Sequence, residues 1–443
     1  MNKLIYLSMA IIPILINGMS PESDSVQDKI FEIQLQYDSL DNSYYAILDM
    51  GNKVQQQNFK FLIDTGSENT FVQVKNCHTC LEKNKQKQIR ECEQSNCQEN
   101  QTSRINYGIG KIDVYETIDY LVFQDLQNGE TFTLDVVMSH VTEVSKELMN
   151  KQLNGLIALQ FKQDPSDNQD KNPFIFRFKK EGKIDDELVF SINFRKQDAA
   201  LILGGVKTDL IPQNQTIQYV SKDDQNWVIN LSNFEVGNSS ILDQIQQPNP
   251  TNQTNLVEPD QKSISEKEDQ FKAVIDSGSN IIALNQNQIE NFKDILQNQY
   301  NITCMVQAFT QLNYSQLKCK NPDGRIDQYP PLRLTFIDQN GEDFVITIPP
   351  KNYVEEKVVD QSQTLSIISF LKNNIPNQII LGYPFLQNKY IVFDQRNKQI
   401  GFVQLEPLDY QMCSTQVMKY ILVGLLIMYI GYSAARSIIK KIF

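Results

Sequence analysis

The chain has 443 residues, which is enough for two lobes that each bury a core of their own. Its formal net charge is −12. A strongly acidic chain is a poor partner for nucleic acid, so we expect no nucleic-acid-binding function. Asn and Gln are abundant, and we interpret this as a compositional bias that lengthens loops.

The chain begins with a single Lys and a long apolar run, which is typical of a secretory signal peptide. We predict a signal peptide over residues 1–19, cut between Asn17 and Ser20; a retained membrane anchor is the alternative. Residues 20–40 form a short N-terminal segment of mixed composition. Entry into the secretory pathway agrees with seven candidate glycosylation sequons, at Asn100, Asn214, Asn230, Asn238, Asn252, Asn301 and Asn313.

Two stretches share one pattern, residues 61–67 (FLIDTGS) and residues 273–279 (AVIDSGS). In each, an apolar run predicted as a buried strand ends in Asp, a hydroxyl residue, Gly and Ser. One copy alone could be an ordinary turn at the end of a strand. Two copies place Asp64 and Asp276 212 residues apart in a chain of two similar halves, which indicates a carboxylate pair at a shared interface.

Two facing carboxylates share one proton, so the pair offers an acid and a base at once. The ionised member can take a proton from a water held between them, and the protonated member can polarise a carbonyl oxygen. The Gly after each Asp brings backbone N–H groups to the carboxylates, and the hydroxyls of Ser67 and Ser279 are expected to orient them. The predicted supporting residues are therefore Thr65, Gly66, Ser67, Ser277, Gly278 and Ser279.

On these paired motifs the chain resembles a pepsin-like aspartic protease of the eukaryotic, bilobal, membrane-anchored type. The resemblance implies an all-β fold with a few short helices, with a first lobe over residues 41–220, a second over 221–408, and an active site in the cleft between them. It implies an endopeptidase that hydrolyses peptide bonds through a water activated by catalytic Asp64 and Asp276. Protein or peptide substrates, no metal, no cofactor and a monomeric state follow from it.

Three features depart from the family's pattern. The segment before the first lobe is short and acidic, where the family carries a longer basic propeptide. Phe71 takes the place of a Trp, so it keeps the packing but lacks the indole N–H that steadies the flap Tyr. Ala158 stands where the family usually has Gly.

Residues 105–112 carry Gly at alternate positions after a Tyr, which suits a tight hairpin tip. The resemblance identifies this hairpin as the flap over the substrate, with Tyr107 as the flap tyrosine and Gly108 and Gly110 beside it. An ordinary β-hairpin is the alternative, but the position of Tyr107, 43 residues after Asp64, favours the flap.

Four cysteines lie within 21 residues: Cys77, Cys80, Cys92 and Cys97. In a secreted chain two disulfides are expected here, with the pairing open, although the Cys77-x-x-Cys80 spacing also suits a zinc site. Cys304 and Cys319 are expected to pair and to close a 16-residue loop, a contribution of roughly 3 kcal/mol in the loop-entropy model.

The remaining predicted elements complete the two lobes. Residues 239–270 are polar and charged, and we expect a flexible surface insertion there. Short helices are predicted over 174–178 and 286–298, and strands of the lobes and of the sheet between them over 44–48, 190–192, 200–205, 379–382, 390–394 and 400–403.

The tail contains a predicted transmembrane helix over residues 417–435, whose 19 residues would span about 28 Å. Basic residues follow, so residues 436–443 are expected to be cytoplasmic and the lobes lumenal or extracellular, as in a single-pass type I membrane protein of the secretory pathway. Lys440-Lys441 resembles a retrieval signal for the endoplasmic reticulum, and a basic stop-transfer flank is the alternative. A buried C-terminal helix and a lipid-anchor signal are the other interpretations of the span.

Two other functional classes are open. One is a catalytically inactive pepsin-like binding protein. The other is a different hydrolase, but His78 and His140 lie outside any nucleophile or zinc motif and the chain has no Gly-x-Ser-x-Gly elbow.

Overall fold

The computed structural model describes most of the two lobes. The described residues are 29–50, 57–73, 77, 79–80, 102–107, 110–145, 154–164, 169–223, 226–242, 271–309, 314–320, 325–360, 363–373, 375 and 377–407. The predicted signal peptide, transmembrane span and cytoplasmic tail lie outside them, as do residues 243–270 of the predicted insertion. Among the described residues no helix is long and apolar enough to cross a membrane.

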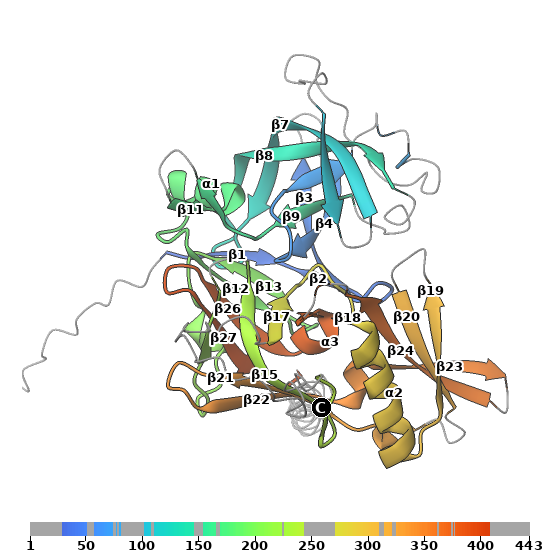
Figure 1. The fold of residues 1–443 in the computed structure, drawn as a ribbon. Coiled ribbons are helices and arrows are strands. Elements are labelled where there is room, and N and C mark those ends of the chain that lie inside the picture. Colours follow the sequence, from blue (N-terminus) through green and yellow to red (C-terminus); the bar gives the residue numbers. More distant parts are fainter. Residues whose placement is uncertain are drawn as a thin grey trace, which may run out of the picture.

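The first lobe is built on an eight-stranded sheet, at the top of Figure 1. Its strands, in spatial order, are β2 (Gln36–Asp38), β3 (Ser43–Met50), β4 (Gln57–Asp64), β9 (Gly155–Ala158), β5 (Phe71–Gln73), β8 (Thr131–Val144), β7 (Gly110–Gln124) and β6 (Ser103–Tyr107). A separate two-stranded sheet joins β10 (Lys162–Asp164) to β11 (Gln169–Lys171). The all-β prediction is thereby confirmed for this lobe.

The second lobe is built on an eleven-stranded sheet. Its main path is β19 (Cys304–Phe309), β20 (Tyr314–Lys320), β24 (Gln363–Lys372), β18 (Ile282–Leu284), β25 (Gln378–Leu381), β17 (Phe271–Ile275), β15 (Val228–Val236), β21 (Leu332–Ile337) and β22 (Asp343–Ile348). Off this path, β16 (Ser239–Ser240) pairs with β15 and β23 (Val354–Asp360) with β24.

A six-stranded sheet lies between the two lobes and takes strands from both ends of the chain (Figure 1). Its order is β1 (Phe31–Gln34), β13 (Ala200–Leu203), β12 (Val189–Asn193), β26 (Lys389–Asp394), β27 (Gln399–Gln404) and β14 (Gln218–Ser221). β1 and β2 both fall within the segment 20–40 that sequence analysis placed before the first lobe. The segment therefore contributes to the fold rather than only preceding it.

Among the described residues the helices are few and short, as expected. They are α1 (Pro173–Lys180), α2 (Gln286–Tyr300), α3 (Tyr383–Leu386) and the 3₁₀ turns η1 (Thr208–Leu210), η3 (Ile326–Gln328) and η4 (Pro350–Asn352). Asn172 caps α1 by accepting bonds from two N–H groups of its first turn. Asn285 and Gln288 form a capping box that starts α2. These caps explain why both predicted helices begin where they do.

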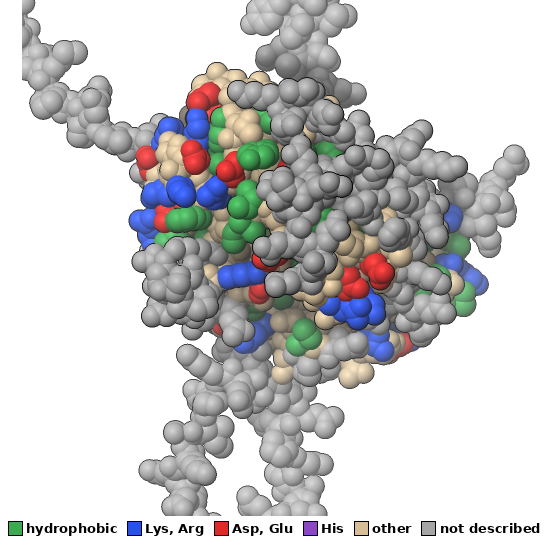
Figure 2. All heavy atoms as spheres, turned by 90° about the horizontal axis from the view of Figure 1, so that it is seen from above, with side chains coloured by type: hydrophobic (Ala, Val, Ile, Leu, Met, Phe, Trp, Pro, Cys, Tyr) green, Lys and Arg blue, Asp and Glu red, His purple; other side chains and the backbone are tan. Residues whose placement is uncertain are grey.

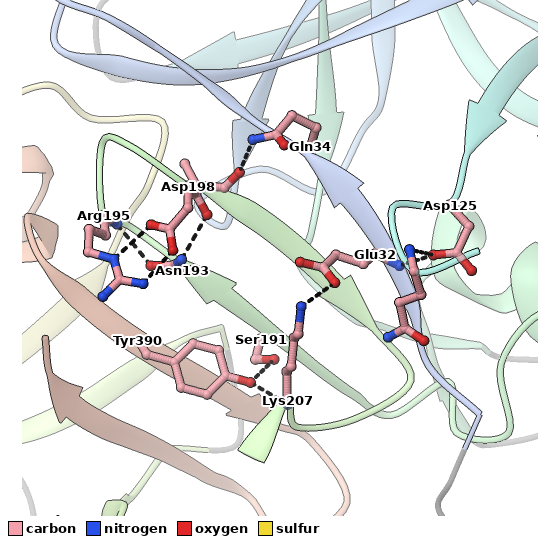
Figure 3. Close-up of polar contacts among 11 residues, drawn as sticks. Glu32, Gln34, Asp125, Ser191, Asn193, Arg195, Asp198, Lys207 and Tyr390 are labelled. Carbon is pink, nitrogen blue, oxygen red and sulfur yellow. Dashed lines mark hydrogen bonds and ion pairs between the residues drawn. The ribbon is translucent and has the colours of Figure 1, made fainter. Parts of the chain in front are cut away.

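Polar groups on one face of the six-stranded sheet are paired with one another (Figure 3). The Lys207 ammonium lies 2.6 Å from a carboxylate oxygen of Glu32, which ties the segment after β13 to β1. The Tyr390 hydroxyl lies 2.7 Å from the Ser191 hydroxyl and accepts a 2.7 Å bond from the backbone N–H of Lys207. Because each of these polar groups has a hydrogen-bond or ion-pair partner, burying it next to the core costs little free energy.

Acidic and basic side chains are interspersed over the described part of the upper face, as Figure 2 shows. Ion pairs at the surface, such as Lys179 with the partly exposed Glu187 at 3.0 Å, follow from this mixing. Pairs of this kind contribute little to stability because water screens them. The four described sequon residues are all exposed, namely Asn214, Asn230, Asn238 and Asn301.

Trp227 is the one Trp of the chain and connects the second lobe to the first. It is 1% exposed and packs edge-on against Phe161, Phe190 and Phe393. Its indole N–H donates a 3.0 Å hydrogen bond to the carbonyl of Leu159, the residue after β9. The start of the second lobe is thus fixed against a strand that runs through the first lobe.

We expect Trp227→Phe to lower the free energy of unfolding by about 1–3 kcal/mol, because it leaves the buried Leu159 carbonyl without its donor. Denaturant unfolding followed by circular dichroism measures this loss. A change below about 0.5 kcal/mol, the usual effect of a neutral surface substitution, would show that the contact does not hold the lobes together.

Candidate active site

The two predicted catalytic residues come to one place. Asp64 is the last residue of β4, and Asp276 directly follows β17. A Cβ built on Gly66 would lie 2.6 Å from the nearest carboxylate oxygen of Asp276, and one built on Gly278 would lie 2.4 Å from the carboxyl carbon of Asp64. Each carboxylate therefore lies against the glycine of the opposite loop, in space that any side chain would fill.

Parallel strand pairs place both carboxylates at the ends of buried strands. β4 runs parallel to β9, and β17 runs parallel to β25, so each Asp lies beside a strand that crosses behind its loop. The carbonyl of Asp64 accepts a 2.8 Å bond from Leu159 N–H, and Asp276 N–H donates a 3.2 Å bond to the Leu381 carbonyl. The same apolar run that predicted a buried strand thus delivers a carboxylate at its end in both lobes.

Backbone N–H groups reach both carboxylates as the sequence predicted. Gly66 N–H donates to Asp64 at 2.7 Å, and Gly278 N–H donates to Asp276 at 2.9 Å. A carboxylate oriented by such a bond keeps one oxygen fixed. The motif Asp-hydroxyl-Gly is therefore a local turn in which the third residue orients the first.

The serines that end the two motifs behave differently. Ser67 donates its hydroxyl to Asp64 at 2.5 Å, as predicted. The matching prediction for Ser279 is wrong, because its hydroxyl donates a 2.9 Å bond to the backbone carbonyl of Ile281. A serine hydroxyl readily bonds a carbonyl two residues on when the turn brings that carbonyl within reach. The two carboxylates therefore have unlike surroundings.

Thr65 and Ser277 hold the two loops together across the lobe boundary. The Thr65 hydroxyl donates to the Ile275 carbonyl at 2.8 Å and accepts from Ser277 N–H at 2.9 Å. The Ser277 hydroxyl donates to the Ile63 carbonyl at 2.7 Å and accepts from Thr65 N–H at 3.0 Å. Both residues were predicted to support the carboxylates, but this role was not predicted, although the hydroxyl residue after each Asp could have signalled it.

The predicted flap residues lie beside the site. Tyr107 ends β6 and pairs with Gly110 at the start of β7, which makes the expected hairpin; Gly108 lies outside the described residues. The Tyr107 ring packs edge-on against Phe71, with ring centroids 6.1 Å apart. Burial and then the charge of Asp64 raise the pKa of the Tyr107 hydroxyl above its ordinary value, against the opposing effect of the Ser67 hydroxyl.

The Tyr107 hydroxyl is buried and has no hydrogen bond of acceptable geometry within the described chain. Phe71 offers it a ring edge and no donor, which agrees with the effect expected from the absence of an indole N–H. Packing against the Phe71 ring is therefore the main contact of this tyrosine, and the Ser67 hydroxyl lies near enough to offset part of the rise in its pKa.

The two strands that cross behind the loops differ at matching positions. Ala158 pairs with Asp64 and is accommodated, with its N–H bonded to Thr70 and its carbonyl to Asn172. A Cβ on Gly382 would lie 2.3 Å from the carbonyl oxygen of Ser279. The first lobe thus tolerates the methyl group that departs from the family's pattern, whereas the second has no room for one.

The polar support behind the first loop was not predicted from the sequence. The Gln160 amide donates to the Gly66 carbonyl at 2.9 Å, and the Asn172 amide donates to the Gln160 carbonyl at 2.6 Å. The Asn-Pro pair that starts α1 is a helix-start signal from which Asn172 could have been predicted as a cap, but its second role, the bond to Gln160, leaves no such signal.

The cysteines form disulfides where the structure describes them. Cys77 is bonded to Cys80, and Cys304 is bonded to Cys319, as expected for the second pair. The Cys77–Cys80 bond removes that pair as zinc ligands, while Cys92 and Cys97 lie outside the described residues. Within the described part of the chain, no group of three His, Cys, Asp or Glu side chains could hold a metal ion.

Comparison with known proteins agrees with this geometry. The model of the eukaryotic aspartyl protease family matches residues 43–405. The chain is similar to plasmepsin I of Plasmodium falciparum, with 22% identity over 366 residues, 81% of this chain and 68% of that protein. It is also similar to plasmepsin VIII of Plasmodium berghei (strain Anka), with 24% identity over 387 residues, 82% of this chain and 87% of that protein.

We expect Tyr107→Phe to leave the free energy of unfolding unchanged or to raise it slightly, because the substitution removes a buried hydroxyl that has no partner. Tyr390→Phe is the matched control and should cost about 1–3 kcal/mol, because that hydroxyl is fully buried and has two partners. Equal losses in the two variants, measured by denaturant unfolding, would contradict the prediction.

We expect Gly382→Ala to destabilise the protein by about 1–3 kcal/mol, because its methyl group overlaps backbone oxygens of the loop after Asp276. The reverse change at the matching position, Ala158→Gly, should cost only about 0.5–1 kcal/mol. Thermal unfolding of the two variants compares them directly. If the Gly382→Ala protein unfolds at the wild-type temperature, the loop after Asp276 accommodates a methyl group as well as the first loop does, and the prediction is wrong.

Proposed function

The chain belongs to the eukaryotic aspartyl protease family, and on that basis we propose that it is an aspartic endopeptidase whose catalytic groups are Asp64 and Asp276. The observation that carries the proposal is the reciprocal packing of each carboxylate against the glycine of the opposite loop. Two carboxylates held this close cannot easily both ionise, so one proton is shared between them.

The proposed reaction is hydrolysis of a peptide bond by a water held between the two carboxylates. One carboxylate takes a proton from the water as general base, and the oxygen of that water attacks the carbonyl carbon. The other carboxylic acid donates its proton to the carbonyl oxygen, which becomes a hydroxyl of the tetrahedral intermediate. As the intermediate collapses, the first carboxyl group gives the proton that it took from the water to the leaving amine, and the C–N bond breaks. A hydroxyl of the intermediate returns its proton to the second carboxylate as the product carbonyl forms, so the dyad ends as it began and the scheme uses no metal or cofactor.

The parts around the dyad support this reaction. The Thr65 and Ser277 bonds fix the spacing of the loops, and the N–H groups of Gly66 and Gly278 fix one oxygen of each carboxylate. Tyr107 belongs to a hairpin that can cover a bound peptide and exclude water. Protein or peptide substrates follow from the family.

The proposed setting is a lumenal or extracellular compartment. Two disulfides suit an oxidising environment, and the exposed sequons could be glycosylated there. We retain the proposals of a signal peptide over residues 1–19, one membrane span over 417–435, and retrieval to the endoplasmic reticulum by Lys440-Lys441. None of these segments lies within the described residues.

The test is cleavage of a mixed peptide library by the full chain in non-ionic detergent, from pH 3 to 7.5, with and without pepstatin. We expect Asp64→Asn and Asp276→Asn each to lower the rate by at least about 10²-fold, because each removes an acid–base group. Asp327→Asn is the matched control. The Asp327 carboxylate is exposed, forms an ion pair with Arg325 and belongs to neither Asp loop.

Each outcome of this test is informative. If the Asp64→Asn variant and the Asp276→Asn variant both still cleave peptides at the wild-type rate, the assignment of the dyad is wrong. A folded chain that cleaves nothing at any pH would favour the alternative, a catalytically inactive binding protein of the same family.

A further inference from the structure

We propose that a cavity between β14, β22, β26 and β27, with Lys389 among its lining residues, binds a carboxylate carried on an apolar body with a neighbouring amide N–H. This is the chemistry of an N-acylated amino acid, either free or as the C-terminal end of a peptide. The proposal is independent of the protease activity, because no residue of the two Asp loops lines this cavity.

Lys389 is a deeply buried lysine of the six-stranded sheet. It is the first residue of β26 and is 2% exposed, and its ammonium has no hydrogen bond within the described residues. Its nitrogen lies 5.1 Å from the centre of the Phe385 ring. Burial lowers the pKa of Lys389 to about 7. A lysine placed in this way costs the fold stability unless an anion restores its charge.

Asn352 supplies a second unsatisfied group in the same cavity. Its amide N–H donates to the Pro384 carbonyl at 3.2 Å, but its side-chain oxygen is buried without a donor in the described part of the chain. Both Asn352 and Lys389 line the cavity. The cavity lining thus contains a buried donor that lacks an acceptor and a buried acceptor that lacks a donor. A ligand with a carboxylate and an N–H that displaces the groups covering these two atoms would satisfy both.

The cavity has room and apolar surface for the rest of such a ligand. Its volume is about 650 Å³, and it lies between β14, β22, η4, β26 and β27. The rings of Phe344 and Phe402 line it and offer a surface for an apolar side chain. A bare inorganic anion would leave this apolar surface uncovered.

The charged side chains of the lining predict how binding depends on pH. Besides Lys389 they are Lys351, from η4, and Glu406, after β27. A bound carboxylate favours the charged form of Lys389 and so raises its pKa. Since Lys389 titrates near 7 in the free protein, binding should weaken as the pH rises above 7 and should take up a proton there.

The test is isothermal titration of the full chain in non-ionic detergent, at pH 6 and pH 8. All proteins carry Asn214→Gln, which removes the sequon at the edge of the cavity. The probe is N-acetyl-L-leucine, and its neutral control is N-acetyl-L-leucinamide. We expect the acid to bind at least about tenfold more tightly than the amide at pH 6, which corresponds to about 1.4 kcal/mol.

Two variants separate the contributions of Lys389 and Asn352 to binding. Lys389→Met should abolish the preference for the acid and leave the unfolding temperature equal or higher, because it replaces a buried cation by an apolar side chain. Asn352→Ala should weaken binding of N-acetyl-L-leucine but not of 4-methylpentanoate, which has the carboxylate and the apolar body without the N–H. Lys196→Met, at a lysine that does not line the cavity, is the control for loss of charge.

Equal binding of acid and amide, or unchanged binding by Lys389→Met, would overturn the proposal. Acetate that binds as tightly as N-acetyl-L-leucine would overturn the assignment of an apolar body. A tripeptide ending in leucine that binds at least as tightly as N-acetyl-L-leucine assigns the ligand to peptide ends, and weaker binding of the tripeptide assigns it to the free acid.

Discussion

The position of the carboxylate pair depends on four hydrogen bonds that Thr65 and Ser277 exchange across the lobe boundary. Each hydroxyl both accepts from the opposite loop and donates to it, so neither loop can shift without leaving buried backbone groups unpaired. Both residues are almost fully buried, which keeps water from competing for these bonds. A constraint of this kind lets two lobes made from distant parts of the chain present their carboxylates at a fixed spacing.

The backbone around this pair is nearly symmetric, but the side chains are not. Ser67 orients Asp64, whereas Ser279 turns to a carbonyl of its own loop. A methyl group is present at Ala158 and excluded at Gly382. The matching strands thus fix where the two carboxylates lie. The differences between the loops give each carboxylate a different environment. Unlike environments are what separates the pKa values of two carboxyl groups in a pair that shares acid and base roles.

Much of this site could be predicted from the sequence because its signals are local. An apolar run that ends in Asp-hydroxyl-Gly specifies a strand and a turn, and its repetition specifies a pair. The direction of the Ser279 hydroxyl could not be predicted, since two acceptors compete and only the folded turn decides between them. Lys389 was also beyond prediction, because a lysine at the edge of an apolar run is expected to mark the end of a buried strand rather than its first buried residue.

Lysines in and beside the six-stranded sheet show how this fold treats cations that are partly or fully buried. Lys207 pairs with Glu32, and Lys222, which is 8% exposed, donates to the Asp223 carbonyl at 2.8 Å. Lys389 belongs to the same sheet and is more deeply buried than either, yet its ammonium has no hydrogen bond within the described residues. Where a lysine serves the structure alone, the chain supplies its acceptor. The exception lines a cavity that also holds the unsatisfied oxygen of Asn352, which is the pattern expected when the missing partners come from a ligand.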